Sequence, residues 1–229
     1  MTTPAPTTHH LGRRPVLGAG IVTAAVCVVL MMWIDAPVAL FLNNFQATPL
    51  VAGFKVITNL ANSGIWYALA LIGMGIALVR ARVEASAAAQ DLLRRRLRAG
   101  VFLISSMVAS GVLINGIKLL VGRDRPRVLF SDGVAGFHPL AQSLTASGFP
   151  SGHAQSITGA MIAIAWIYPP LRFACLLVAV VISASRVIVG AHFVSDIIAG
   201  AFLAIAVALI FRAAFERDGI PLDLTARQI

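Results

Sequence analysis

Six long apolar stretches, joined by polar segments, restrict what this sequence can fold into. Apolar residues make up 59% of the 229 residues and charged residues 12%. About 20 apolar residues in helical form cross the hydrocarbon core of a bilayer, where only helices and closed barrels satisfy their own backbone hydrogen bonds. The sequence therefore predicts an all-α, polytopic membrane protein with six transmembrane helices. These spans are expected at residues 16–34, 65–79, 100–121, 151–168, 171–189 and 193–211.

The segments outside the spans suggest a simple domain plan. Residues 1–14 are polar and rich in Pro and Thr, and they predict a disordered cytoplasmic tail. Residues 15–212 form the predicted six-helix membrane domain, and residues 213–229 a cytoplasmic C-terminal tail. Within the domain, the semi-polar segment 35–64 predicts short helices that lie along the membrane surface. Pro169-Pro170 should end the fourth span.

The basic residues predict the orientation of the domain. Cytoplasmic segments of membrane proteins are enriched in Lys and Arg. The loops on one side carry an excess of arginine, much of it in a helical linker expected at residues 80–98. That side should be cytoplasmic, which places both termini in the cytoplasm. Topology then explains the net charge of +9 without a nucleic acid partner.

Polar side chains that are costly in hydrocarbon fall at the opposite, outer ends of the spans. Each charged group costs about 2.5–3.5 kcal/mol at the centre of a membrane helix, so its presence indicates function. Segments separated by dozens of residues should therefore meet at one outer face. They are Lys118 and Arg125, the run Ser151-Gly152-His153, Arg186, and the pair His192 and Asp196.

The chemistry of this set favours a phosphate ligand. Three cations with few acidic neighbours suit a polyanion, and a guanidinium matches phosphate oxygens. Ser151 should cap a helix whose first N–H groups bind an anion. His192 lies one helical turn before Asp196, which would fix its tautomer. Snorkelling cations, a plain helix cap and a structural histidine are the simpler interpretations, but they do not account for the whole set.

The spacing of these residues resembles the three-part signature of the type 2 phosphatidic acid phosphatase superfamily. That superfamily includes membrane lipid phosphate phosphatases, soluble bacterial acid phosphatases and vanadium haloperoxidases. The signature reads K-x6-RP from Lys118, PSGH from Pro150, and SR-x5-H-x3-D from Ser185. The six-span plan also resembles the membrane-bound members over most of the chain.

The resemblance implies a role for each residue. His192 would attack phosphorus and form a phosphohistidine, with Asp196 orienting its ring. His153 would protonate the leaving oxygen and later activate water. No cofactor and no metal are expected, because fixed cations would neutralise the phosphate in the transition state. The phosphate oxygens would be held by Lys118, Arg125, Ser151, Gly152 and Arg186.

These observations predict a phosphatase of a bacterial inner membrane, with its active site facing the periplasm or cell exterior. The substrate would be a phosphomonoester or pyrophosphate of a lipid, of the phosphatidate, phosphatidylglycerol phosphate, undecaprenyl pyrophosphate or lipid A type. Selectivity is expected to lie in residues 35–64 and 122–149, and no oligomeric state is predicted. The alternatives are a lipid phosphotransferase, a haloperoxidase that binds vanadate, and an anion or lipid-phosphate transporter. Transporters usually show internal repeats and a midplane site, which this sequence lacks.

Several further residues carry weaker signals. Arg123, Arg127 and His138 lie near the signature but outside it, and solvated loop residues are the preferred interpretation, with headgroup contact as the alternative. Cys27 and Cys175 lie inside apolar stretches and predict buried, free side chains rather than a disulfide or a metal site.

Overall fold

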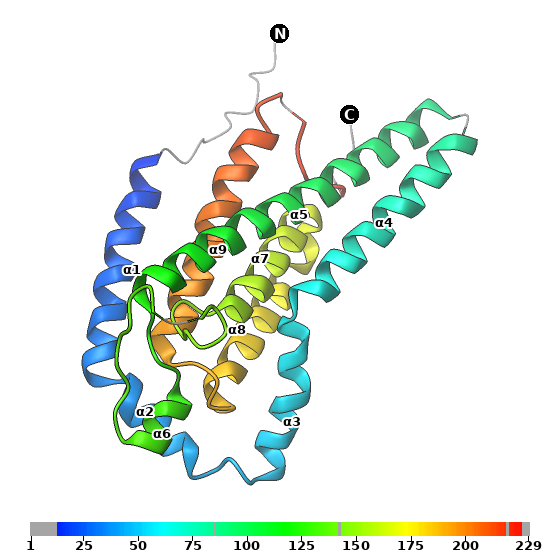
Figure 1. Ribbon diagram of the computed structural model, residues 1–229. Coiled ribbons are helices and arrows are strands. Elements are labelled where there is room, and N and C mark those ends of the chain that lie inside the picture. The colour runs from blue at the N-terminus through cyan, green and yellow to red at the C-terminus, as the bar shows by residue number, and fades with distance from the viewer. Residues whose placement is uncertain (1–12, 85, 142, 219, 226–229) are drawn as a thin grey trace.

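A computed structural model describes residues 13–84, 86–141, 143–218 and 220–225, and the chain is helical throughout most of these ranges (Figure 1). Within them, the β pairing is limited to one isolated bridge between Arg123 and Phe137. The all-α prediction is confirmed, while the predicted disordered tail falls almost entirely outside the described residues. The helices are α1 (Arg13–Trp33), α2 (Asp35–Asn43), α3 (Pro49–Ile57), α4 (Ser63–Val83), α5 (Ala87–Val121), α6 (Pro126–Asp132), α7 (Gly152–Ile167), α8 (Arg172–Ile188) and α9 (Val194–Phe215), with 3-10 turns η1 (Thr58–Ala61) and η2 (Pro169–Leu171).

The described helices supply five of the predicted membrane spans. α7, at the position of the predicted fourth span, has 16 residues. It measures roughly 24 Å at 1.5 Å per residue, against about 30 Å for a hydrocarbon core. It ends before Pro169 and Pro170, as predicted. A total of six spans stays a prediction. The five helices of sufficient length and apolarity are Pro15–Trp33, Ser63–Val83, Ala87–Val121, Pro169–Ile188 and Val194–Phe215.

The arginine-rich segment 80–98 is not a separate helical linker, because its arginines belong to the end of α4 and the start of α5. α4 continues to Val83, and the Ser86 side chain caps α5 by accepting a hydrogen bond from the Ala89 N–H at 3.5 Å. α5 then runs for 35 residues without interruption. Ala, Leu and Arg are strong helix formers, so a polar sequence gives no reason for the helix to stop before the apolar stretch begins.

α7 lies at the centre of the bundle and packs against α5, α8 and α9 (Figure 1). Its residues 154–160 are all buried. Ile157 belongs to an apolar cluster that includes Phe102 and Met107 of α5 and Ile182 of α8. Close packing of this kind drives helix association in lipid, where the hydrophobic effect between helices is absent. Cys27 and Cys175 are free and buried, as predicted.

The two ends of the bundle differ in what they contain. α1 begins and α9 ends at the upper end in Figure 1, whereas α2, α3 and α6 lie at the lower end. The short helices predicted within residues 35–64 are therefore present, and the Thr48 side chain caps α3. After α9 the chain folds back, because Leu222 is buried and the Leu224 N–H donates to the Ile167 carbonyl oxygen at 3.0 Å.

Candidate active site

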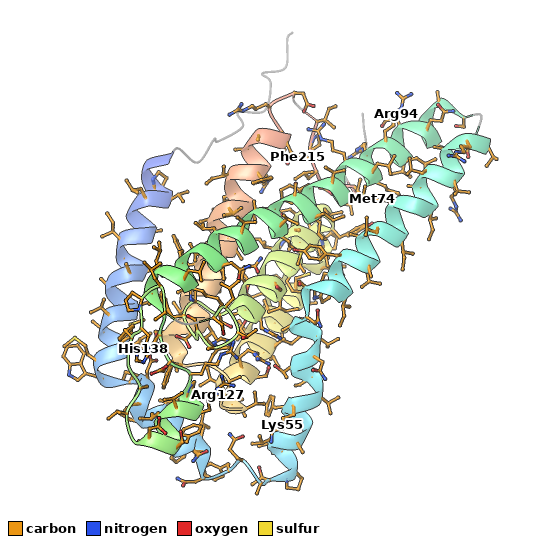
Figure 2. The ribbon with its side chains drawn as sticks, viewed as in Figure 1. Lys55, Met74, Arg94, Arg127, His138 and Phe215 are labelled. Carbon is orange, nitrogen blue, oxygen red and sulfur yellow. The ribbon has the colours of Figure 1, made fainter. Side chains whose placement is uncertain are left out.

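The residues of the predicted signature come from five separate segments that meet at the lower end of the bundle. Lys118 lies in the last turn of α5, Arg186 in the last turn of α8, and His153 in the first turn of α7. The charges of Lys118, Arg125, Arg186 and His192 all act on the His153 imidazole. Figure 2 labels Arg127 and His138 at this end, with Arg94 and Phe215 at the opposite end. The folded chain therefore brings together the two imidazoles and the three cations.

His192 and Asp196 form a buried pair at the start of α9. His192 Nδ1 lies 3.4 Å from Asp196 Oδ2, and the same oxygen accepts a hydrogen bond from the Phe193 N–H at 2.8 Å. His192 is 1% exposed. Burial lowers the pKa of His192 to about 4, although Asp196 acts in the opposite direction. The ring is therefore neutral at physiological pH, with Nδ1 directed to the carboxylate and Nε2 pointing away from it.

Ser151 caps α7 and also joins it to α9. Its side chain accepts a hydrogen bond from the Ala154 N–H at 3.3 Å, and its own N–H donates to the Asp196 carbonyl oxygen at 2.9 Å. The side-chain oxygen and the backbone N–H of Ser151 are thus engaged within the protein. The N–H groups of Gly152 and His153 stand in the first turn, where a helix offers them no acceptor of its own. A Cβ at Gly152 would meet no heavy atom within 4 Å, so open space lies in front of this turn.

Two of the three cations are held by groups from distant segments. Lys118 Nζ donates to the Ser147 carbonyl oxygen at 2.7 Å, and Arg186 Nη1 donates to Thr58 Oγ1 at 2.9 Å. Burial lowers the pKa of Arg125, and the nearby charge of Arg127 lowers it further. Within the described part of the chain, the Nε atoms of Arg125 and Arg186 are buried without a hydrogen-bond partner.

The sequence matches the PAP2 superfamily over residues 99–219, a range that contains all of these signature residues. The chain belongs to this superfamily. The resemblance found in the motifs is therefore confirmed, and the residues of the PAP2 signature are those that the fold brings together.

Three PAP2-related proteins illustrate the relationship. The lipid A 1-phosphatase of Rhizobium johnstonii is 29% identical over 201 residues, which cover 87% of this chain and 80% of that protein. The lipid A 1-phosphatase of Rhizobium etli is 37% identical over 101 residues, 44% of each chain. The crystal structure of a transmembrane PAP2-type phosphatidylglycerolphosphate phosphatase from Bacillus subtilis superimposes with a TM-score of 0.63 at 18% identity. The superposition covers 88% of this chain and 96% of the Bacillus subtilis chain. The two proteins therefore share a fold.

Arg123 corrects one sequence-based interpretation and reveals a residue that the sequence did not indicate. It is 6% exposed, so it is not a solvated loop residue. Its Nη1 lies 2.7 Å from Asp196 Oδ1 and its Nη2 lies 2.9 Å from Asp35 Oδ2. Asp35, at the start of α2, is also buried and was not among the predicted site residues. Its acidic side chain directly after an apolar stretch was the one available signal.

Arg127 and His138 are exposed, as expected, but Arg127 lies in the short helix α6 rather than in a loop. His138 Nε2 lies 3.2 Å from Asp124 Oδ2. A cavity of about 420 Å³ adjoins the PAP2 signature on the side of His153. It is lined by polar and apolar groups of η1, α4, α5 and α7, among them Tyr67 and Asn115.

Proposed function

We propose that this protein is an integral membrane phosphatase that hydrolyses a phosphomonoester or pyrophosphate of a lipid through a phosphohistidine intermediate. One observation carries the proposal. Two imidazoles, one of them paired with a buried carboxylate, lie within electrostatic range of three cations at one end of an apolar helix bundle. This arrangement suits an anionic headgroup whose tails remain in the bilayer.

The reaction would proceed in two displacements. In the first, His192 Nε2 forms a bond to phosphorus while the bond to the leaving oxygen breaks, and His153 donates a proton to that oxygen. In the second, His153 takes a proton from water, whose oxygen attacks phosphorus and releases His192. Asp196 would stabilise the positive ring of the phosphohistidine through Nδ1, which lies 3.4 Å from its carboxylate.

The cations would hold the charge that develops on the phosphate oxygens. Lys118, Arg125 and Arg186 supply the side-chain donors, and Gly152 and His153 supply N–H groups in the first turn of α7. Ser151 would act mainly through its cap. The same three cations repel a positive charge on His153, and a bound phosphate offsets that repulsion. Binding of the substrate and protonation of His153 are therefore coupled.

The proposed topology places six spans in a bacterial cytoplasmic membrane, with α7 as the short fourth span. A 16-residue helix that begins at the site would set the phosphate slightly below the outer surface. The arginines of residues 80–98 lie at the other end of the bundle, where the positive-inside tendency predicts the cytoplasm. Both termini would then be cytoplasmic, and the site would face the periplasm or cell exterior.

The Rhizobium relatives make lipid A phosphates the first substrates to test, beside phosphatidate, phosphatidylglycerol phosphate and undecaprenyl pyrophosphate. Purified protein should release inorganic phosphate from at least one of these lipids, with a chelator present and no metal added. Release that needs added metal would contradict the metal-independent mechanism. Phosphate that appears on another lipid instead of in solution would identify a phosphotransferase. Flux into proteoliposomes without hydrolysis would favour a transporter.

A further inference from the structure

We propose that Arg123 is a positioning residue, which holds the Asp196 carboxylate behind His192 and is itself held by Asp35. The inference rests on the proposed function, because it assigns His192 as the nucleophile. Arg123 lies outside the PAP2 signature, and its partner Asp35 lies before the range that matches the superfamily.

The two oxygens of Asp196 have separate partners. Oδ1 faces Arg123 Nη1 at 2.7 Å, whereas Oδ2 faces His192 Nδ1 at 3.4 Å and the Phe193 N–H at 2.8 Å. A carboxylate bound at both oxygens cannot rotate without losing one of these contacts. Arg123 therefore fixes the plane in which Asp196 presents its second oxygen to the imidazole.

Arg123 is also fixed. Its Nη1 donates to Ser195 Oγ at 2.7 Å, and its guanidinium lies 4.2 Å from the centre of the Phe193 ring. Asp35 completes the arrangement by accepting hydrogen bonds from Arg123 Nη2 at 2.9 Å and from the Ser195 N–H at 3.0 Å, and it also bonds the Ser195 hydroxyl. Both terminal nitrogens of Arg123 are directed at carboxylates. Arg123 is therefore placed to support Asp196 rather than to contact the substrate.

The charges of this network match the chemistry of His192. One arginine with two buried carboxylates leaves a single negative charge, which balances the positive ring of the phosphohistidine. Removing the arginine charge would leave two carboxylates that favour uptake of a proton on themselves or on His192. Either event inactivates the nucleophile at low pH. The charged and titratable groups around Asp196 and His192 are Lys118, Arg123, Arg125, Asp35, His153 and Cys27, with Arg186 beyond His153.

The test uses purified full-length protein and the pH dependence of phosphate release. Arg123→Gln should lower kcat about 10- to 100-fold, the loss seen when a group that orients a metal-binding histidine is removed, with KM close to wild type. The acid limb of its pH profile should move to higher pH. The double variant Arg123→Gln/Asp35→Asn restores the charge balance, so it should recover part of kcat and return the acid limb towards wild type. The kcat of Arg123→Lys should lie between those of the wild type and of Arg123→Gln.

The matched control is Arg212→Gln. Arg212 also pairs with a carboxylate, Glu216 at 2.9 Å, and lies over an aromatic ring, Trp166 at 5.0 Å, at the other end of α9. The Arg212→Gln variant should leave kcat and the pH profile unchanged.

Two outcomes would overturn the inference. One is an Arg123→Gln variant with wild-type kcat and pH profile, and the other is a double variant no more active than the single one. If Arg123→Gln does not fold, Arg123→Lys takes its place, because lysine keeps the charge but lacks the two terminal nitrogens that reach Asp196 and Asp35. Wild-type kcat in Arg123→Lys would then overturn the inference. Wild-type protein without activity on any lipid would overturn the proposed function, and the inference with it.

Discussion

The Ser151 N–H donates to the Asp196 carbonyl oxygen at 2.9 Å, so two parts of the signature are joined by their backbones. The contact holds the first turn of α7, with His153, against the first turn of α9, which follows His192. Gly200, one turn further along α9, lies so close to Ser151 that a Cβ there would clash with the Ser151 carbonyl oxygen. The relative position of His153 and His192 therefore depends on backbone approach as well as on side chains.

Gly200→Ala should separate these two helices. We expect a loss of about 1–3 kcal/mol of stability, as for other overpacked sites, together with a clear loss of kcat. Thermal unfolding in detergent and phosphate release measure the two effects. Gly73→Ala in α4 is the control, because its Cβ would meet no heavy atom within 4 Å. Equal behaviour of the two variants would show that the approach at Gly200 is unimportant.

Replacing His192 and replacing His153 should block different steps of the reaction. His192→Ala should abolish both turnover and covalent labelling of the protein by a phosphate-labelled lipid. His153→Ala should slow turnover strongly, yet retain some labelled phosphoenzyme, because His192 remains able to attack. Labelling after an alkaline quench, which preserves phosphohistidine, separates the cases. Wild-type turnover in His192→Ala would end the proposed mechanism.

Activity should be bell-shaped in pH, since His192 must be neutral and His153 protonated. Burial lowers the pKa of His192 to about 4, so His192 is neutral above that value and becomes protonated as the pH falls through it. The acid limb of kcat/KM should therefore lie near pH 4 rather than near the ordinary histidine value of about 6.5. Protonation of His153 is coupled to phosphate binding, so loss of that proton from the substrate complex should produce the alkaline limb of kcat. A flat profile from pH 4 to 9 would contradict the assignment.

Removing the Thr58 hydroxyl should weaken substrate binding, because this hydroxyl helps to hold Arg186 in place. Thr58→Val keeps the shape of the side chain and removes the acceptor for Arg186 Nη1. A hydrogen bond of roughly 0.5–1.5 kcal/mol corresponds to about a two- to tenfold fall in kcat/KM. Thr23→Val is the control, because the Thr23 hydroxyl bonds the Ala19 carbonyl oxygen within α1. A similar effect in both variants would point to general destabilisation instead.

The sequence predicted the helical class and the gathering of the signature residues because both depend on strong local signals. Apolar stretches of span length, and polar residues at the outer ends of the third to sixth predicted spans, are visible without coordinates. The length of α5 was missed because the predicted boundaries followed polarity, whereas helix propensity continues through the arginines. The network of Asp35 and Arg123 was missed for another reason. The two residues are 88 positions apart, and neither has a periodic or motif partner that would reveal the contact.

Asp35 and Thr58 both precede residue 99, where the match to the superfamily begins. Each is the acceptor for one arginine near the reaction centre. A fragment cut to the matched range would retain the signature but release Arg123 and Arg186 from these anchors. We therefore expect the smallest working form of this enzyme to begin before Asp35, well ahead of the range that carries the signature.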